Sequence, residues 1–352
     1  MGGTPAKSIM ESENLSDNKI HVVLAVYDPR GTYSRHAGVV MVSMFSNTKS
    51  PICVHILHDE TLNEDNRSKF IELTEKFGQQ INFIDAGEHI GKFCVDVDKL
   101  THRYSRGSLF RLFIQDLLPV DKVIYLDCDV AVQLDIKELW DIELDDCEIG
   151  AVLEDIARNP GDNSQKKLFF CKYAGIEAEK YFNSGVILFN LKKIKENNVN
   201  VFALALEFFR RYPYSSFPDQ DFMNKMFQKN MREIDRKFNY FGSGIDYSNV
   251  NGKLWHFVEF EGKKPWELAQ NPIIDALYWR YFAMTPWSRD LAADMTEAWA
   301  GSRFIHVHSS DCFRTLRRKL KEHFSPRSMT PLFKIAVIWH DLIYRIRKKF
   351  GV

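Results

Sequence analysis

The chain contains 352 residues, 45% of them hydrophobic, which is enough for a sizeable buried core. Because its 47 Lys/Arg residues equal its 47 Asp/Glu residues, the chain as a whole lacks the charge of a nucleic-acid-binding protein. No apolar run reaches the roughly 18 residues that span a bilayer. The polar residues 1–18 lack the apolar core of a secretory signal, and we expect them to be a flexible leader.

Apolar strands and helical segments alternate along the first third of the chain. We expect strands at residues 20–28, 52–59, 81–86 and 122–130, and helices from about 34 to 46, over 62–78 and over 105–119. Further strand candidates are 148–155, 182–195 and 230–241. This order predicts an α/β fold with a mostly parallel sheet covered on both faces. Ligands of such sheets bind beyond the carboxyl ends of the strands, where Asp28, Asp127 and Asp129 are expected to lie.

The segment "VIYLDCDV" leads an apolar strand into Asp127 and Asp129. Residues two apart on a strand share a side, so the two carboxylates are expected to converge while Cys128 faces the other way. Close carboxylates repel unless a cation lies between them or one is protonated. Mg²⁺ or Mn²⁺ suits such oxygen ligands and keeps positions open for a diphosphate. Because Asp-x-Asp is common by chance, the alternative is that Asp129 begins a polar turn.

Three later segments add polar groups to this picture. "YFNSGVILFNL" places Asn183, Ser184 and a glycine just before an apolar strand, where the amide can bind a hydroxylated ligand. "FPDQDFMN" places acids at a helix start, where an Asp can instead cap the helix. "LWHFVEFEGKKPW" joins His256 to a Gly-Lys-Lys-Pro loop, which can supply a third metal ligand and cations for phosphate. A lone histidine is more often structural.

Together these segments resemble glycosyltransferase family 8, the retaining nucleotide-sugar-dependent enzymes that include bacterial lipopolysaccharide galactosyl- and glucosyltransferases. The matching pieces, "AVYDPRGTY", "SRGSLFRLFIQDLLP", "DKVIYLDCDV", "YFNSGVILFNL", "DQDFMN" and "GKKPW", span residues 20 to about 267. The resemblance implies a GT-A fold, a single Rossmann-like nucleotide-sugar-binding domain over residues 19–300. It also implies a UDP-sugar donor and Mn²⁺ or Mg²⁺ as cofactor.

The resemblance also implies roles for individual residues. Asp127, Asp129 and His256 would ligate the metal, and Asp219 and Gln220 would join the two aspartates in catalysis. The implied donor contacts are Ala25, Val26, Asp28, Tyr33, Arg111, Asp127, Cys128, Asn183, Ser184, Gly262 and Lys264. Two alternatives stay open: Lys263 can replace Lys264 as the phosphate contact, and Arg111 can be an exposed residue on a helix.

The implied reaction moves a hexose, galactose or glucose, from a UDP-sugar to a saccharide or lipid-linked acceptor in cell-surface polysaccharide or lipopolysaccharide synthesis. Front-face displacement is favoured over a covalent intermediate. The main alternative is a nucleotidyltransferase that makes a nucleotide-sugar. It would usually carry a Gly-rich phosphate loop after the first strand, whereas "DPRGTYSR" has one glycine. A binder without catalysis is disfavoured by the intact acids and His256.

Residues 301–352 carry twelve Lys/Arg and three Asp/Glu, a net charge of +9. As a helix from about Pro331, the segment has Ile335, Trp339 and Leu342 on one face and basic residues on the other. We expect a basic amphipathic extension whose residues 313–352 lie on an anionic membrane surface. The alternative is a helix packed on the catalytic domain. The expected location is cytoplasmic, peripheral on the inner face of the cytoplasmic membrane.

Six cysteines are spread along the chain without a Cys-x-x-Cys pair. We expect them to be reduced thiols, in keeping with a cytoplasmic protein. A zinc site is not expected, because no pair of ligands has the sequence spacing typical of one.

Overall fold

The structure is a computed structural model, and it describes residues 19–92, 106–157, 162–242, 244–258, 264–267, 271–292, 294–295 and 298. The expected leader (1–18) and basic extension (301–352) lie outside these residues. Among the described residues, no helix is both long and apolar enough to cross a bilayer.

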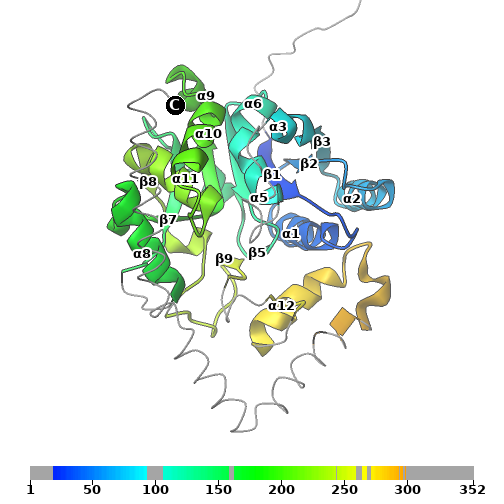
Figure 1. The fold of residues 1–352 in the computed structure, drawn as a ribbon. Coiled ribbons are helices and arrows are strands. Elements are labelled where there is room, and N and C mark those ends of the chain that lie inside the picture. The colour runs from blue at the N-terminus through cyan, green and yellow to red at the C-terminus, as the bar shows by residue number, and fades with distance from the viewer. Residues whose placement is uncertain are drawn as a thin grey trace, which may run out of the picture.

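Seven strands form a mixed sheet in the order β3-β2-β1-β4-β7-β6-β8 (Figure 1). They are β1 (Ile20–Val26), β2 (Ile52–His58), β3 (Gln80–Asp85), β4 (Lys122–Leu126), β6 (Ile149–Leu153), β7 (Phe182–Asn190) and β8 (Met231–Glu233). The first four strands of the chain pair in parallel, whereas β7 runs antiparallel to both β4 and β6. Strands β5 (Val130–Val132) and β9 (Leu254–His256) form a separate antiparallel pair. The predicted α/β class is confirmed.

Helices cover both faces of the sheet. The α-helices are α1 (Ser34–Asn47), α2 (Glu64–Lys76), α3 (Gly87–Lys92), α5 (Arg106–Phe110), α6 (Ile114–Leu117), α7 (Lys137–Trp140), α8 (Asp162–Ala174), α9 (Leu191–Glu196), α10 (Val201–Arg211), α11 (Pro218–Phe227) and α12 (Pro272–Phe282). The 3₁₀ helices are η1 (Arg111–Phe113), η2 (Ala178–Lys180), η3 (Gln228–Asn230), η4 (Arg236–Phe238) and η5 (Ser288–Asp290). Helices α1, α2 and α12 pack in one buried cluster with Leu24, and α5, α10 and α11 pack in the other with Val23 (Figure 1). Successive residues of β1 therefore serve two cores, as strand alternation requires.

Several predicted elements agree with the structure, whereas others are wrong in part. The strand expected over 182–195 ends at Asn190, and α9 follows it. The first three strands and the helix at 62–78 are confirmed, and Asn63 caps α2 by accepting a hydrogen bond from the Asn66 backbone N–H. The single helix expected over 105–119 is wrong, because the chain there divides into α5, η1 and α6. The strand expected over 122–130 ends at Leu126. Of the strand expected over 230–241, only β8 forms.

Candidate active site

Asp127 and Asp129 lie in the turn between β4 and β5. The strand-based reason for their convergence is therefore wrong, yet the two carboxylates do converge on His256. The His256 Nε2 atom lies 3.2 Å from Asp129 Oδ1 and 3.9 Å from Asp127 Oδ2. Pairing of β5 with β9 explains this, because Val130 is directly opposite His256. The three residues form a group that could hold a metal ion.

The histidine is oriented by Asn239, a fully buried residue after η4. His256 Nδ1 lies 2.9 Å from Asn239 Oδ1, and because an amide oxygen can only accept, Nδ1 is the nitrogen that donates. The Nε2 atom is buried and has no hydrogen-bond partner within the described residues, although the Asp129 oxygen is close. In the neutral ring its lone pair then faces two carboxylates. This set of ligand atoms fits a divalent cation. In metal sites a binding histidine usually donates its other ring N–H to an oxygen that fixes its orientation, as Nδ1 does here.

Two cations flank the carboxylates. Arg111 donates from Nη2 to Asp127 Oδ1 at 2.8 Å and from Nη1 to the Ser184 carbonyl at 2.6 Å. Its Nε lies 3.5 Å from Asp219 Oδ2. Only 5% of Arg111 is exposed, so the alternative of an exposed helix residue is wrong. Burial opposes its charge, but the neighbouring carboxylates, Asp127 first, raise the pKa of Arg111 above its usual value.

Lys264 donates from Nζ to Asp129 Oδ2 and to the Phe257 carbonyl. Burial would raise the pKa of Asp129, but Lys264 and His256 outweigh it and hold that pKa well below its ordinary range. Lys264 therefore lies in direct contact with the Asp129 carboxylate. Gly262 and Lys263 lie outside the described residues.

We predict that Arg111→Met lowers the free energy of unfolding by about 3–5 kcal/mol, because it leaves buried carboxylates without their cation. Urea denaturation monitored by circular dichroism measures this. The matched control is Arg232→Met, which removes an exposed pair with Asp145, the side chains being 44% and 74% exposed. That change is expected to cost less than about 1 kcal/mol. Equal losses for both variants would contradict the prediction.

Polar side chains around β7 form a network in two parts, one through Ser184 and one through Asn183. Asn183 and Ser184 lie inside β7, and not before it as expected. Gln220 Oε1 accepts from the Ser184 backbone N–H at 3.1 Å, and Gln220 Nε2 donates to Glu154 Oε2 at 3.1 Å. Asn183 Oδ1 accepts from Asn239 Nδ2 at 2.9 Å. The predicted Ser184 and Gln220 are thus brought together, and Asn183 is joined to His256 through Asn239.

Sequence reasoning missed Asn239 and Glu154. Each is a single polar residue in a segment without a recognisable motif, and only the fold brings it to the network. Lys167 was missed for the same reason, and it pairs with Glu154 at 2.5 Å. Tyr181 was missed although it begins the segment "YFNSGVILFNL", and its hydroxyl lies 3.2 Å from Gln220 Nε2. No signal in the sequence marks Asn239, Glu154 or Lys167.

Asp221 gives a pH prediction. It does not cap α11, since its carboxylate accepts from the Tyr181 and Ser215 hydroxyls, and burial raises its pKa to about 7. A raised carboxyl pKa means that the folded state binds the proton more tightly, so this contribution to stability is present below about pH 4 and is lost as pH rises to about 7. Relative to Asp221→Asn, the wild type should lose up to about 1.4 kcal/mol of unfolding free energy per pH unit between pH 5 and 7. Parallel urea titrations of both proteins test this, and a constant difference would contradict it.

The residues expected at the uridine lie around the start of α1. Both oxygens of the buried Asp28 are engaged: Oδ1 accepts from the Tyr33 N–H at 2.8 Å and Oδ2 from the Ser34 N–H at 2.9 Å. Cys128 Sγ donates to the Ala25 carbonyl at 3.2 Å, which ties the aspartate turn to the end of β1, next to Val26.

Tyr33 sits close to the same turn. Burial, followed by the charges of Cys128 and Asp129, raises the pKa of Tyr33 well above its usual value. Its ring meets His36 edge-on, with centroids 5.5 Å apart, and His36 stacks on Trp266 at 3.8 Å. The Lys-Pro-Trp segment is thereby packed against α1, so the phosphate and uridine ends of the expected donor site are held together.

The acidic centre lies beyond the carboxyl ends of β1 and β4, where the parallel sheets of α/β enzymes place their active sites. Residues 25–269 match the model of glycosyltransferase family 8, and the chain belongs to this family. It is a glycosyltransferase. The chain is 25% identical to general stress protein A of Bacillus subtilis over 77% of its own length and 96% of that protein. It is 27% identical to a lipopolysaccharide 1,3-galactosyltransferase of Salmonella typhimurium, over 57% of this chain and 58% of that one.

Solved structures agree on the fold. The galactosyltransferase LgtC, solved in complex with donor and acceptor sugar analogues, superposes with a TM-score of 0.62 at 22% identity, covering 78% of this chain and 100% of that one. The expected GT-A fold is confirmed. The match to other curated relatives is partial, covering 60% of a Haemophilus influenzae glycosyltransferase and 44% of GlyB from Streptococcus pneumoniae.

Proposed function

We propose that this enzyme transfers a hexose, galactose or glucose, from a UDP-sugar with retention, using Mn²⁺ or Mg²⁺ held by Asp127, Asp129 and His256. The observation that carries the proposal is the buried His256 Nε2, unpartnered and facing both carboxylates. Family membership supports the reaction class. When bound, the cation would stabilise the negative charge that develops on departing UDP.

Side chains of this protein would bind and position the rest of the donor. Lys264, with the backbone at Gly262, would hold the diphosphate, and Ala25, Asp28 and Tyr33 would hold the uridine. Because the Asp28 carboxylate is taken up by the start of α1, it would act mainly by fixing that backbone. Arg111 would position Asp127 through their direct ion pair.

The sugar would lie against Asn183, Ser184, Asp219 and Gln220. Gln220 is a neutral amide with its oxygen and nitrogen both hydrogen-bonded, and Asp219 faces Arg111. Neither is a free nucleophile, which supports front-face displacement, with a phosphate oxygen of the leaving group accepting the proton of the acceptor hydroxyl. Detection of a glycosyl-enzyme adduct by intact mass spectrometry would exclude this route.

The acceptor is proposed to be a saccharide or lipid-linked glycan of the cell surface. Relatives named lipopolysaccharide 1,3-galactosyltransferase and lipopolysaccharide 1,2-glucosyltransferase, at 27% and 26% identity, support this. The enzyme would then act in the cytoplasm, where nucleotide-sugars are made.

The test is a panel of UDP-sugars with Mn²⁺, Mg²⁺ or chelator, scored for UDP release with and without lipid-linked oligosaccharide. We expect release with one UDP-hexose, dependent on the cation and raised by acceptor. A parallel reaction with UTP and a hexose 1-phosphate tests the nucleotidyltransferase alternative. Pyrophosphate release there, with no UDP release from any UDP-sugar, would overturn the proposal.

A peripheral membrane location is proposed from the sequence of residues 313–352, which lie outside the described residues. Truncation after Ser325 should abolish co-sedimentation with vesicles that contain anionic lipid, because it removes the aromatic face and six of the twelve Lys/Arg residues. UDP-sugar hydrolysis should be unchanged. Vesicles of neutral lipid are the control, and equal sedimentation of full-length and truncated protein would contradict the proposal.

A further inference from the structure

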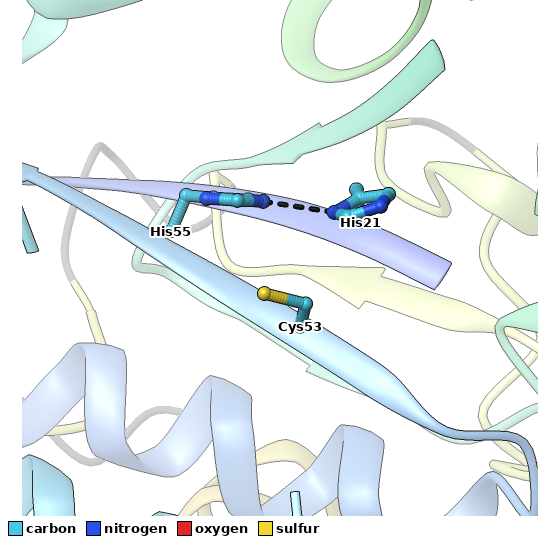
Figure 2. Close-up of side chains that lie close together, drawn as sticks. All are labelled: His21, Cys53 and His55. Atoms are coloured by element: carbon cyan, nitrogen blue, oxygen red, sulfur yellow. Dashed lines mark hydrogen bonds between the residues drawn. The ribbon is translucent and has the colours of Figure 1, made fainter. Parts of the chain in front are cut away.

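A second group of metal-binding side chains lies away from the active site, on β1 and β2. His21, Cys53 and His55 each offer a ligand atom, and these atoms all lie within 4.8 Å of one another (Figure 2). Residues 21 and 53 are the second residues of their strands and pair in register. The group therefore lies toward the amino ends of the parallel strands, whereas the active site lies beyond their carboxyl ends.

The strand register creates this group. Cys53 and His55 are two residues apart on β2 and so share a side, and His21 stands beside Cys53 on β1. His21 Nδ1 lies 3.0 Å from His55 Nε2, the contact drawn as a dashed line in Figure 2. His21 precedes Cys53 and His55 by 32 and 34 residues in the sequence. Spacing rules for metal sites do not detect ligands that lie so far apart along the chain.

The surroundings favour metal ligation over simple packing. Cys53 and His55 are each only 4% exposed, and His55 is a buried polar residue between Val54 and Ile56 on β2. Asn82 on β3 donates from Nδ2 to Cys53 Sγ at 3.3 Å, a contact that stabilises a thiolate.

We propose that His21, Cys53 and His55 form a Zn²⁺ site that joins β1 to β2. Zinc binds imidazole nitrogen at about 2.0–2.1 Å and thiolate sulfur at about 2.3 Å, which places neighbouring ligands about 3.3–3.7 Å apart. The observed ligand atoms, all within 4.8 Å of one another, lie near that spacing. Sulfur and nitrogen ligands select zinc over the hard cations that suit carboxylates, and three protein ligands leave a fourth position open.

Cobalt is the probe, because a thiolate–Co²⁺ bond gives a near-ultraviolet charge-transfer band and the sulfur-free Asp127/Asp129/His256 site cannot. Full-length protein is stripped with chelator, desalted and titrated with Co²⁺. We expect the band in the wild type and in the Asp127→Asn/Asp129→Asn double variant, saturating at about one Co²⁺ per chain in the latter. Added Zn²⁺ should abolish it.

Variants of the group separate this site from other thiols. Cys53→Ser should abolish the band. Asn82→Ala should weaken Co²⁺ affinity about 10- to 100-fold, the usual effect of removing a residue that hydrogen-bonds a metal ligand. Cys147→Ser, which removes a partly exposed thiol elsewhere, should leave it unchanged. Far-ultraviolet circular dichroism checks folding. If Cys53→Ser is unfolded, His55→Gln replaces it and should also lose the band.

Two results would overturn the proposal. One is a wild type without a charge-transfer band at saturating Co²⁺. The other is a folded Cys53→Ser or His55→Gln variant that keeps the band with wild-type affinity. Neither result bears on UDP-sugar turnover, so the proposal stands or falls independently of the proposed function.

Discussion

Asp129→Asn is expected to lower UDP release by about 100- to 1,000-fold, because it removes a ligand of the cation that would stabilise departing UDP, and loss of one electrostatic stabiliser usually costs this factor. The change keeps the size of the side chain but removes its charge, which both His256 and Lys264 face. Isothermal titration calorimetry should show weaker Mn²⁺ binding, and steady-state assays at several Mn²⁺ concentrations should show turnover that excess metal only partly restores.

The control for this change is Asp146→Asn. Asp146 is a surface carboxylate, 98% exposed and paired with Lys193 at 3.0 Å, so its loss removes one negative charge without touching the site. It should leave turnover and Mn²⁺ affinity at the wild-type values. Wild-type turnover in Asp129→Asn, with folding intact, would rule out a metal-binding role for this carboxylate.

Gly185→Ala is expected to abolish Mn²⁺ binding and turnover. A Cβ atom at position 185 would lie 2.2 Å from His256 Cε1 and 2.8 Å from Asp127 Oδ2, so one methyl group displaces two of the three expected ligands. The backbone cannot yield easily, because the Gly185 carbonyl accepts the Asp127 N–H at 2.7 Å. The overpacking should also lower unfolding free energy by about 1–3 kcal/mol.

Gly91→Ala is the matched control, since a Cβ there has no heavy atom within 4 Å and its φ is not in the left-handed region. It should leave turnover, Mn²⁺ affinity and stability near the wild-type values. Activity measurements alone cannot separate misfolding from ligand displacement, so calorimetry and urea denaturation are run on both variants. Wild-type Mn²⁺ affinity in a folded Gly185→Ala variant would contradict the prediction, because the proposed ligands would then tolerate a methyl group at position 185.

The sequence predicted the parallel half of the sheet well, because buried parallel strands are continuous apolar runs with Val- and Ile-rich composition. It also predicted that Asp127, Asp129 and His256 come together. The reason offered for the two aspartates was wrong: β4 stops at Leu126, and a turn presents them. Convergence depends on the β5–β9 pairing, a contact between segments more than 120 residues apart that local pattern cannot indicate.

The residues that orient the active-site side chains were harder to predict from the sequence. Asn239 lies within a segment expected to be a strand, but β8 ends at Glu233 and the asparagine follows a 3₁₀ turn. Its role arises only because the fold places it between Asn183 and His256. Arg111 was recognised through the resemblance, whereas its burial required the break of the expected helix at η1.

Strand β1 runs between the two proposed cation sites, with His21 near its start and the aspartate turn tethered to Ala25 near its end. Divalent zinc binds protein ligands far more tightly than manganese does, and sulfur widens that gap. Graded chelation should therefore act in two stages. A weak chelator would remove the active-site cation and stop catalysis without changing the melting temperature. Only a strong chelator would remove the zinc that joins β1 to β2, and this would lower the melting temperature.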